Sequence, residues 1–240
     1  MNAAPPNASQ TARQRARAEL TREIKEAARR QLAETGAPQL SLRAVARELG
    51  LVSSARYRYF PSRDDLLTAL IIDAYDSLGE AAEAAAAANG TAGPRRGWRA
   101  VCHAVRDWAR ANPHEYALIY GSPVPGYQAP RDTVGPAARV PLVLGQLVRD
   151  SQAIQAASPA APAAAPPVPA LLAAQAAIVA GAIAPGVPEP VIVRVLIAWT
   201  QLFGMISFEL FGQFVGSADP ADDFFGYAIE QMITYIPIAG

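Results

Sequence analysis

One short segment of the chain holds most of the side chains that could do chemistry. It reads GLVSSARYRYFPSRDDLL and runs from Gly50 to Leu67. An arginine can donate two parallel hydrogen bonds to a carboxylate, to a phosphate, or to O6 and N7 of guanine. Serine and tyrosine hydroxyls can donate to phosphate oxygens. The segment therefore suits binding, and a solvated patch, a ligand cage and a nucleic-acid reading element would all use it.

The rest of the sequence offers no set of residues for bond-making chemistry. His103 and Asp107 lie one helical turn apart and His114 is the second histidine, but two ligands are too few for a metal site. A glycine-rich phosphate loop, a nucleophile motif and a convincing pair of catalytic carboxylates are all missing. The sequence predicts no enzyme, no metal and no cofactor. An enzyme that uses an aromatic pocket is the alternative, and turnover of a bound compound would reveal it.

Charge is distributed unevenly although the net charge is zero. Residues 1–63 hold 12 Lys or Arg against 5 Glu, a net charge of +7, and residues 64–240 hold 9 basic against 16 acidic residues, a net charge of −7. A basic end on an acidic body indicates an anionic partner for the first part only. Nucleic acid is the expected partner.

A few residues indicate the cellular compartment and argue against a membrane-spanning helix. Cys102 is the only cysteine, which excludes an internal disulfide and favours a reducing compartment. The first twenty residues lack the apolar stretch of a signal peptide, so a cytoplasmic protein is expected. The apolar stretch 191–215 contains Arg194 and Glu209, and such a charge at a bilayer centre costs about 3 kcal/mol. It predicts a helix buried by protein, with no membrane partner.

Periodic apolar positions place helices around the basic segment. A helix is expected over 19–35, a second begins after the cap Ser41 and ends at Gly50, and a third runs from Ser53 to Phe60. A fourth starts after Ser62 and ends near residue 90. Helix, turn and short helix form the unit that places its second helix in a DNA major groove.

The remaining chain also reads as helical, so the fold class is all-α. Helices are expected over 97–111, from Pro113, and over 132–157, 171–184, 189–212 and 221–236. The domain prediction has a disordered basic arm over 1–17, a helix-turn-helix domain over 18–78, and a regulatory and dimerisation domain over 79–240. That last domain contains an Ala/Pro-rich linker over 158–169.

The stretch LSLRAVARELGLVSSARYRYFPSRDDLLTAL resembles the DNA-binding end of the tetracycline-repressor (TetR) family. The resemblance spans about Glu19 to Ser77. The positions that correspond to the family pattern hold Val45-Ala46, the corner Gly50, Leu51-Val52, Tyr57, Phe60, Ser62-Arg63 and Leu66. Together with the outward spacing of the polar residues, the resemblance implies DNA contacts at Arg43, Ser53, Ser54, Ala55, Arg56, Tyr57, Arg58, Tyr59 and Arg63.

Three residues depart from the family pattern. Val52 stands where a capping serine is usual, Arg56 where an apolar residue packs inward, and Arg63 where lysine is usual. Arg56 either contacts DNA or lies along the small core, and both interpretations stay open. Tyr57 either donates to a phosphate or packs, and Tyr59 is balanced between the same two roles. Phe60 is expected in the core.

Two later stretches, RRGWRAVCHAVRDWARANPHEYALIYGSPVPGY and AWTQLFGMISFELFGQF, resemble more loosely the ligand and dimer domain of a WHG-type TetR subgroup. The resemblance implies a homodimer built from the last two helices and a buried pocket. Dimer candidates are Trp199, Phe203, Gly204, Ile206, Phe208, Gly212, Phe225, Ile229 and Met232. Pocket candidates, each of which is more often plain core, are Trp98, Cys102, His103, Trp108, Tyr116, Tyr120, Tyr127 and Trp199.

These features favour a ligand-responsive transcriptional regulator. A repressor is expected over an activator because the resemblance favours repression, and its partners would be double-stranded DNA, a second copy and a small hydrophobic effector. The alternative is a helical dimerisation or adaptor protein with weakened DNA binding. Val52 and Arg56 are the only residues that support this alternative.

Overall fold

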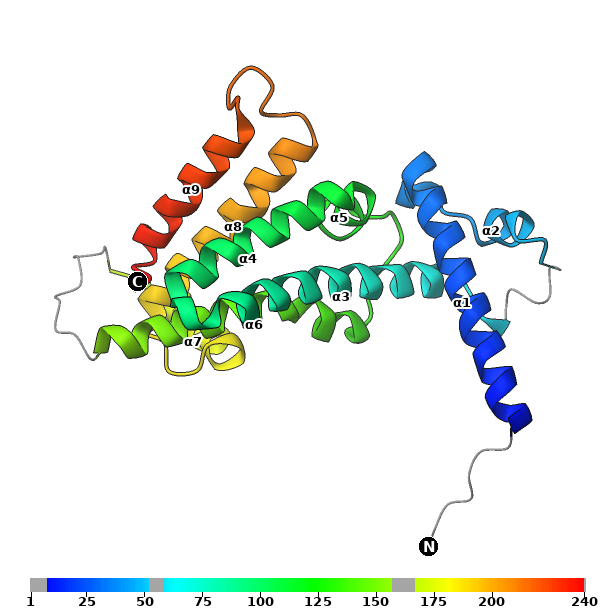
Figure 1. The fold of residues 1–240 in the computed structure, drawn as a ribbon, viewed down its shortest axis with the longest axis horizontal. Coiled ribbons are helices and arrows are strands. Elements are labelled where there is room, and N and C mark those ends of the chain that lie inside the picture. The colour runs from blue at the N-terminus through cyan, green and yellow to red at the C-terminus, as the bar shows by residue number, and fades with distance from the viewer. Residues whose placement is uncertain (1–7, 52–57, 157–166, 240) are drawn as a thin grey trace, which may run out of the picture. The chain divides into compact units, whose positions relative to one another are not determined.

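Every described element of the chain is a helix (Figure 1). The computed structural model describes residues 8–51, 58–156 and 167–239, and it has no strand within those ranges. The prediction of an all-α fold is confirmed. The chain divides into two compact units: the first comprises Met1–Ala74 with His114–Thr133, and the second comprises Tyr75–Pro113 with Val134–Gly240.

The first unit is built on α1 (Ala8–Thr35), η1 (Ala37–Gln39), α2 (Leu42–Glu48), the start of α3 (Arg63–Asn89), most of α5 (Pro113–Tyr120) and η4 (Arg131–Thr133). Its apolar residues follow the helical spacing of each segment and meet in one small core. That core includes Ile24, Ala28, Leu32, Val45, Phe60, Leu66, Leu67 and Tyr116.

The second unit contains the rest of α3, η3 (Gly90–Ala92), α4 (Pro94–Ala111), α6 (Val134–Ala156), α7 (Ala170–Ile183), α8 (Glu189–Leu210) and α9 (Ala221–Tyr235). Helix α4 is its centre and packs against α6, α8 and α9. The contact face of α4 carries Trp98, Val101, Val105 and Trp108, which recur every three or four residues and are all buried.

Two boundaries differ from the sequence-based predictions. Helix α1 begins at Ala8, so residues 8–17 of the expected disordered arm are helical, and residues 1–7 lie outside the described residues. The stretch His114–Thr133 packs with the first unit. Two contacts explain this: Arg29 Nε donates to Glu115 Oε1 at 2.8 Å, and the hydroxyls of Thr68 and Tyr127 lie 2.9 Å apart. Long-range polar contacts of this kind leave no periodic signal in the sequence.

A buried arginine ties three helices of the second unit together. Arg106 on α4 has 4% of its side chain exposed and donates to Glu209 of α8 through Nε at 2.7 Å and Nη2 at 2.8 Å. The Nη2 atom also reaches Asp222 of α9 at 2.7 Å. The guanidinium lies 4.6 Å from the centroid of the Phe225 ring. This arrangement satisfies a charge that would otherwise be costly to bury.

Two glycines allow helices of the second unit to approach closely. A Cβ on Gly97 of α4 would lie 2.6 Å from Leu147 Cδ2, and one on Gly145 of α6 would lie 2.3 Å from the carbonyl oxygen of Ile183 in α7. Both distances are too short for a carbon atom. The α4–α6 and α6–α7 contacts therefore require a residue without a side chain at these positions.

Helix α8 is long and apolar enough to cross a membrane by length and composition, and no other helix of the described residues passes that test. In this structure it packs against α7 and α9 and buries one face, including Ile192, Val195, Leu202 and Ile206. A helix in the core of a protein passes the same test. The described contacts of α8 therefore agree with the expectation of a helix covered by protein.

Candidate nucleic-acid interface

The helix expected to precede the reading element is present as α2, and local hydrogen bonds define both of its ends. The Ser41 side chain accepts from Ala44 N at 3.3 Å, which caps the first turn. At the other end Gly50 has a φ of 64°, in the left-handed region that glycine adopts without strain. Leu51 N then donates to Ala46 O at 2.8 Å, closing the corner. The chain leaves α2 in a turn, as a helix-turn-helix requires.

Polar contacts hold α2 on α1. Arg30 donates to Glu48 Oε1 through Nε at 2.9 Å and Nη2 at 2.6 Å, and Gln31 Oε1 accepts from Ser41 N at 2.6 Å. Val45 and Ala46 bury the inner face of α2, whereas Arg43 and Arg47 lie exposed one turn apart on the outer face. Arg43 was a sequence-based candidate. Arg47 was missed, although its i, i+4 spacing from Arg43 was a readable signal.

The reading element itself is described only at its C-terminal end. Ser53, Ser54, Ala55, Arg56 and Tyr57, with the departure at Val52, lie outside the described residues. Among the residues that follow, Arg58 is exposed, Tyr59 is half-buried and Phe60 is buried. Phe60 thus occupies the core position that the sequence predicted for it.

Arg63 has a different role from the one expected. Its guanidinium donates through Nε to Leu40 O at 2.9 Å and through Nη2 to Ala37 O at 2.8 Å and Pro38 O at 3.2 Å. Its Nη1 lies 3.5 Å from Asp64 Oδ1. The bonds to these carbonyls use two separate nitrogens of the planar guanidinium, a geometry that the single nitrogen of a lysine does not reproduce. Arg63 therefore binds the turn before α2 to the start of α3, which occupies its guanidinium within the first unit.

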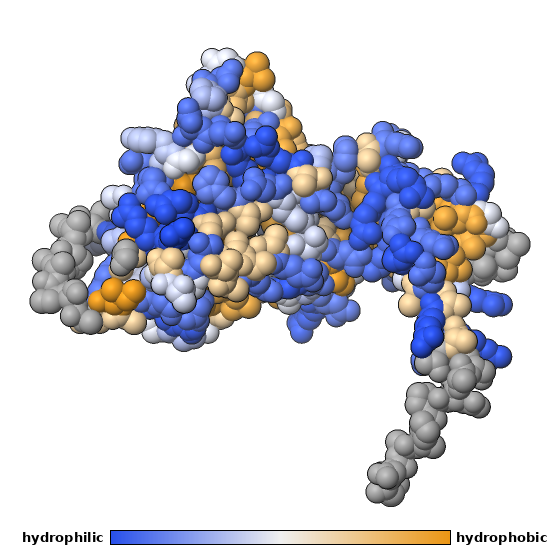
Figure 2. Space-filling view, in the orientation of Figure 1, coloured by the Kyte–Doolittle hydropathy of each residue, from blue (hydrophilic) through white to orange (hydrophobic). Residues whose placement is uncertain are grey.

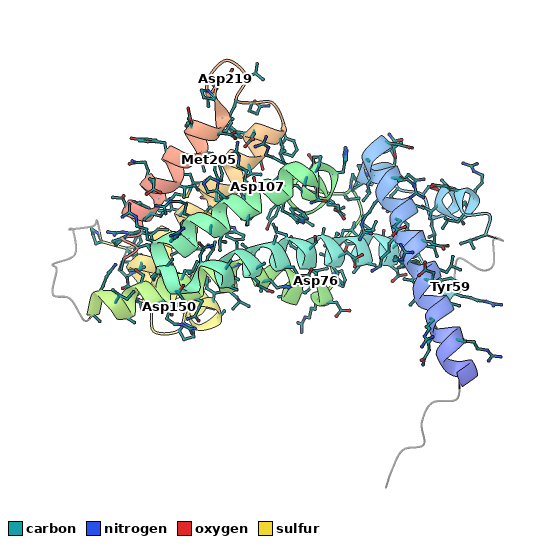
Figure 3. All side chains as sticks on the ribbon, viewed as in Figure 1. Tyr59, Asp76, Asp107, Asp150, Met205 and Asp219 are labelled. Carbon is teal, nitrogen blue, oxygen red and sulfur yellow. The ribbon has the colours of Figure 1, made fainter. Side chains whose placement is uncertain are left out.

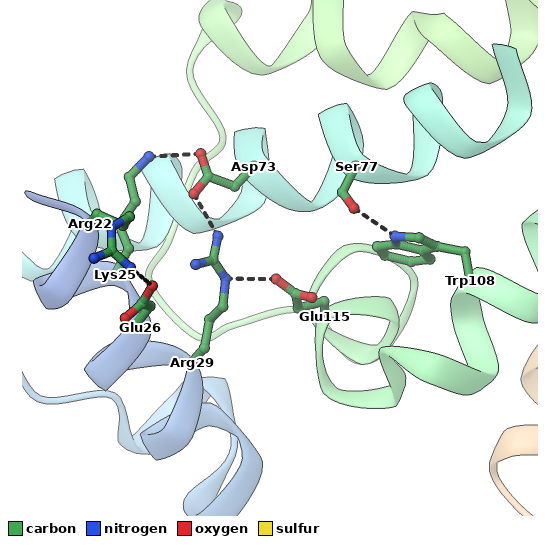
Figure 4. A network of polar contacts seen from close by, with 8 residues as sticks. All are labelled: Arg22, Lys25, Glu26, Arg29, Asp73, Ser77, Trp108 and Glu115. Atoms are coloured by element: carbon green, nitrogen blue, oxygen red, sulfur yellow. Dashed lines mark hydrogen bonds and ion pairs between the residues drawn. The ribbon is translucent and has the colours of Figure 1, made fainter. Parts of the chain in front are cut away.

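A charge network fixes α1 against the start of α3 (Figure 4). Asp73 accepts from Lys25 Nζ and from Arg29 Nη2, each at 2.7 Å, and Arg29 also binds Glu115. These two cations of α1 are therefore neutralised within the first unit. The same figure shows Trp108 Nε1 of the second unit donating to Ser77 Oγ at 2.9 Å.

The eight pocket candidates do not come together in one described cavity. Tyr116, Tyr120 and Tyr127 belong to the first unit, and the other five belong to the second. Cys102 is buried among apolar groups, which raises the pKa of its thiol. His103 meets the Phe225 ring edge-on at 5.4 Å between centroids, and Trp199 lies 4.4 Å from Phe203. Four of the eight are buried, namely Trp98, Cys102, Trp108 and Tyr116, and the other four are half-buried.

Trp98 differs from the other candidates. It is buried, yet its Nε1 has no hydrogen-bond partner in the part of the chain that the structure describes. A buried donor without an acceptor costs about 1–3 kcal/mol, so a ligand that supplied an acceptor to Trp98 Nε1 would recover this free energy. Within the described ranges, no group of three or more His, Cys, Asp or Glu side chains could hold a metal ion.

A groove of about 770 Å³ lies in the second unit, at a place that the sequence did not indicate. One face of α6 lines it, including Leu142, Leu147 and Ile154, together with the end of α3 and the start of α4. At its edge, Arg139 donates to both oxygens of Glu83 at 2.8 and 2.7 Å, which raises the pKa of Arg139 and lowers that of Glu83. None of the eight pocket candidates lines this groove.

The dimer candidates differ in how far they are buried within the protomer. Five of them lie in the protomer's own core, because they form the inner stripes of α8 and α9: Phe203, Ile206, Phe225, Ile229 and Met232. Gly204 and Trp199 are half-buried, and Phe208 and Gly212 are exposed. The large apolar side chains that do face outward on these two helices and their connection are Ile197, Phe208, Phe211, Val215, Phe224, Tyr227 and Tyr235. In Figure 2 hydrophobic surface is visible at the α8–α9 connection.

Family models match both parts of the chain. Residues 24–70 match the model for bacterial regulatory proteins of the tetR family, and residues 98–232 match a tetracyclin repressor-like C-terminal domain. The second match covers more than half of the chain. The first covers α2 and the Gly50 corner, and the second covers Trp98, Arg106 and the outward-facing apolar residues from Ile197 to Tyr227.

Curated relatives and solved structures agree with these matches. The HTH-type transcriptional regulators Rv1816 of Mycobacterium tuberculosis and Mb1846 of Mycobacterium bovis are 50% identical over 129 residues, covering 53% of this chain and 55% of each relative. In these matches the chain spans about half the length of the relatives. A regulatory protein designated SCO4313 is 33% identical, with a TM-score of 0.74 over 96% of this chain and 100% of that one.

A more distant structure supports the fold alone. The TetR family transcriptional regulator PfmR of Thermus thermophilus is 18% identical, with a TM-score of 0.55 over 88% of this chain and 97% of that one. The matches to α2 and its corner, to the C-terminal helices and to a whole solved chain all agree. The protein therefore belongs to the TetR family of transcriptional regulators.

Proposed function

We propose that the protein is a repressor that binds a palindromic operator as a homodimer and is released by a small hydrophobic effector in the cytoplasm. The observation that carries DNA binding is the capped helix α2 with its left-handed corner at Gly50. This corner supports an element leading to Arg58, which is exposed beside the buried Phe60. Arg43 and Arg47 add positive charge on the outer face of α2.

The exposed apolar side chains of α8, α9 and their connection support a dimer. Phe208 is 53% exposed and Tyr227 is 67% exposed, and both are large enough to anchor an interface. A two-fold dimer would place two reading elements on two half-sites about one helical turn apart or a multiple of it. We expect Phe208→Glu with Tyr227→Glu to give monomers in analytical ultracentrifugation. Glu substitution of Ile178, which is exposed on α7, is the control and should leave the dimer intact.

The effector would bind in the second unit. The groove has the volume of an ordinary small-molecule site and an apolar lining with polar groups at its edge. Trp98 Nε1 offers a second, buried place for a hydrogen-bond acceptor. An effector releases DNA only if it binds the DNA-incompetent form more tightly. Leu142→Trp, at an exposed position of the groove lining, would fill the groove, and Trp98→Phe removes the buried donor, so the two variants separate these two sites.

The experiment that tests the proposal is a mobility shift with the DNA upstream of the protein's own gene. Arg43→Ala and Arg58→Ala should each weaken binding by roughly 5- to 100-fold if they reach phosphates or base edges. Salt should weaken wild-type binding steeply. Salt-insensitive binding, with both variants like wild type, would contradict the proposal and favour the adaptor alternative. Repression is then read from a reporter gene placed behind the bound DNA.

A further inference from the structure

The first turns of α1 carry positive charge without any acid. The helix begins at Ala8, and its first acidic residue is Glu19. Arg13, Arg15 and Arg17 lie between them, and all three are exposed. Figure 1 shows this end of α1 (dark blue) continuing straight from the part that packs on α2 and α3. We refer to residues 8–18 as the α1 extension.

The cations further along α1 form ion pairs with carboxylates of the first unit. Lys25 and Arg29 bind Asp73, Arg30 binds Glu48, and Arg22 binds Glu19 and Glu26. The side chains of Arg13, Arg15 and Arg17 are therefore the first positive charges that an anion approaching this end of α1 would meet. The visible face of α1 in Figure 2 is predominantly hydrophilic.

Helix geometry separates the three arginines into two faces. Arg13 and Arg17 are four residues apart and share a face, whereas Arg15 lies about 200° around the helix from Arg13. Arg17 Nη2 donates to the carbonyl oxygen of Arg58 at 3.4 Å, which fixes the direction of the first face. Figure 3 shows the neighbouring residue Tyr59 beside α1. Arg15 instead shares its face with Glu19 at i+4.

Arg13, Arg17 and Arg58 thus follow one another as a row, from the α1 extension to the end of the reading element. Four residues of helix rise about 6 Å, which is close to the rise of two nucleotides along one DNA strand. Guanidinium groups bind phosphates with two parallel hydrogen bonds. A row with this spacing is complementary to a run of phosphates on one strand.

We propose that the α1 extension is a second DNA-binding element, in which Arg13 and Arg17 hold the phosphate backbone that flanks the reading element. The proposal rests on the proposed function and specifies a part of the DNA interface beyond it. Binding by α1 then depends on which residues share a helical face, because only the face with Arg13 and Arg17 points to the DNA strand. The α1 extension contacts no bases, so it adds affinity without sequence preference.

The test compares three substitutions of equal charge change in the full-length protein. Arg13→Gln, Arg17→Gln and Arg15→Gln are titrated by fluorescence anisotropy against the upstream duplex and a scrambled duplex, at several salt concentrations. Each phosphate contact contributes about 0.9 to the slope of log K against log salt, so a dimer losing two should show a slope lower by about 2. Arg13→Gln and Arg17→Gln should each lower the salt slope by about 2 and weaken binding roughly 10-fold on both duplexes. Arg15→Gln should lower the slope by less than half as much.

A fourth variant tests the helical register with no change of charge. Ala16→Pro interrupts the helix between Arg13 and Arg17 and should weaken binding about as much as Arg13→Gln. Equal losses for Arg13→Gln and Arg15→Gln would overturn the proposal, because the charges would then act without a fixed face. Wild-type affinity in Ala16→Pro would also overturn it. If the wild-type protein binds neither duplex, the proposed function fails as well. If the wild type binds DNA and all four variants bind equally well, only the role of the α1 extension is refuted.

Discussion

The two units of this protein use charge in opposite ways. In the first unit ion pairs lie at the margins of a small core, and cations such as Arg43, Arg47 and Arg58 face outward. In the second unit one arginine, Arg106, is buried against Glu209, Asp222 and Phe225 at the junction of α4, α8 and α9. Exposed charge serves contact with an anion, whereas buried charge orders helices. Removing charge should therefore cost binding in the first unit and stability in the second.

The largest effect is expected at the buried junction. Arg106→Leu leaves Glu209, with 17% of its side chain exposed, without its two strongest hydrogen bonds. We expect a loss of about 2–4 kcal/mol in the free energy of unfolding, measured with urea, because an abandoned, nearly buried charge is costly. The control is Arg110→Leu, whose half-exposed side chain lies 3.3 Å from Asp222. It should cost less than about 1 kcal/mol. Equal losses would show that burial is not what distinguishes Arg106.

Helix spacing in the second unit comes next. Gly145→Ala places a carbon 2.3 Å from the carbonyl oxygen of Ile183, so α6 and α7 must move apart. We expect a loss of about 1–3 kcal/mol in the same urea experiment. Gly181→Ala is the matched control, since no atom lies within 4 Å of the added carbon in α7. It should stabilise by about 0.5–1 kcal/mol, because alanine loses less backbone freedom in a helix. A stable Gly145→Ala protein would refute the close approach.

A smaller and more local effect is expected in the first unit. Ser41→Ala removes the cap of α2, and we expect about 1 kcal/mol less protection of the α2 amides in hydrogen exchange. DNA affinity should fall with it, since α2 carries Arg43 and supports the corner at Gly50. Gln39→Ala, at an exposed position just before the cap, is the control. Unchanged exchange in Ser41→Ala would mean that packing alone holds α2.

The smallest effect concerns acid. Hydrogen bonds from Arg99, and then Arg95, lower the pKa of Glu230 below its ordinary value of 4.5. A carboxyl whose pKa is lower when folded contributes stability at neutral pH and loses it as the pH falls through that folded value. Glu230 should therefore add less than about 1 kcal/mol at pH 7, because the ion pair is largely exposed, and it should add none once the pH lies well below the folded pKa. Urea midpoints of wild type and Glu230→Gln should converge on acidification, and a constant gap would contradict this.

Most ends of the described helices were predictable to within a few residues, because apolar periodicity and caps are local, but the start of α1 at Ala8 was not. Ser41, Gly50 and Gly36 define ends that the structure confirms through hydrogen bonds and a positive φ. The assignment of His114–Thr133 to the first unit depends on Glu115 and Tyr127 meeting residues far away in sequence. No local pattern carries that information.

The candidate site was predictable in part for the same reason. Arg43 and Phe60 follow helical spacing, and their exposure and burial agree with it. Arg63 looks identical in sequence to a phosphate-binding residue, and only the positions of three carbonyl oxygens reveal its internal role. On α8 and α9 the sequence shows too many apolar residues for one core. It does not show which of them turn inward, and in the structure Ile229 and Met232 lie buried within the protomer.

Helix α7 carries a consequence for anyone who purifies this protein. Its fourteen residues include no charged side chain, and Leu171 and Ile178 are 86% and 67% exposed. Colloidal stability depends on repulsion between like-charged surfaces, which this helix does not supply. We expect precipitation to begin at lower protein concentration in ammonium sulfate than in sodium chloride, since excluded salts strengthen contacts between apolar surfaces. A single Leu171→Lys change should raise the concentration that stays in solution.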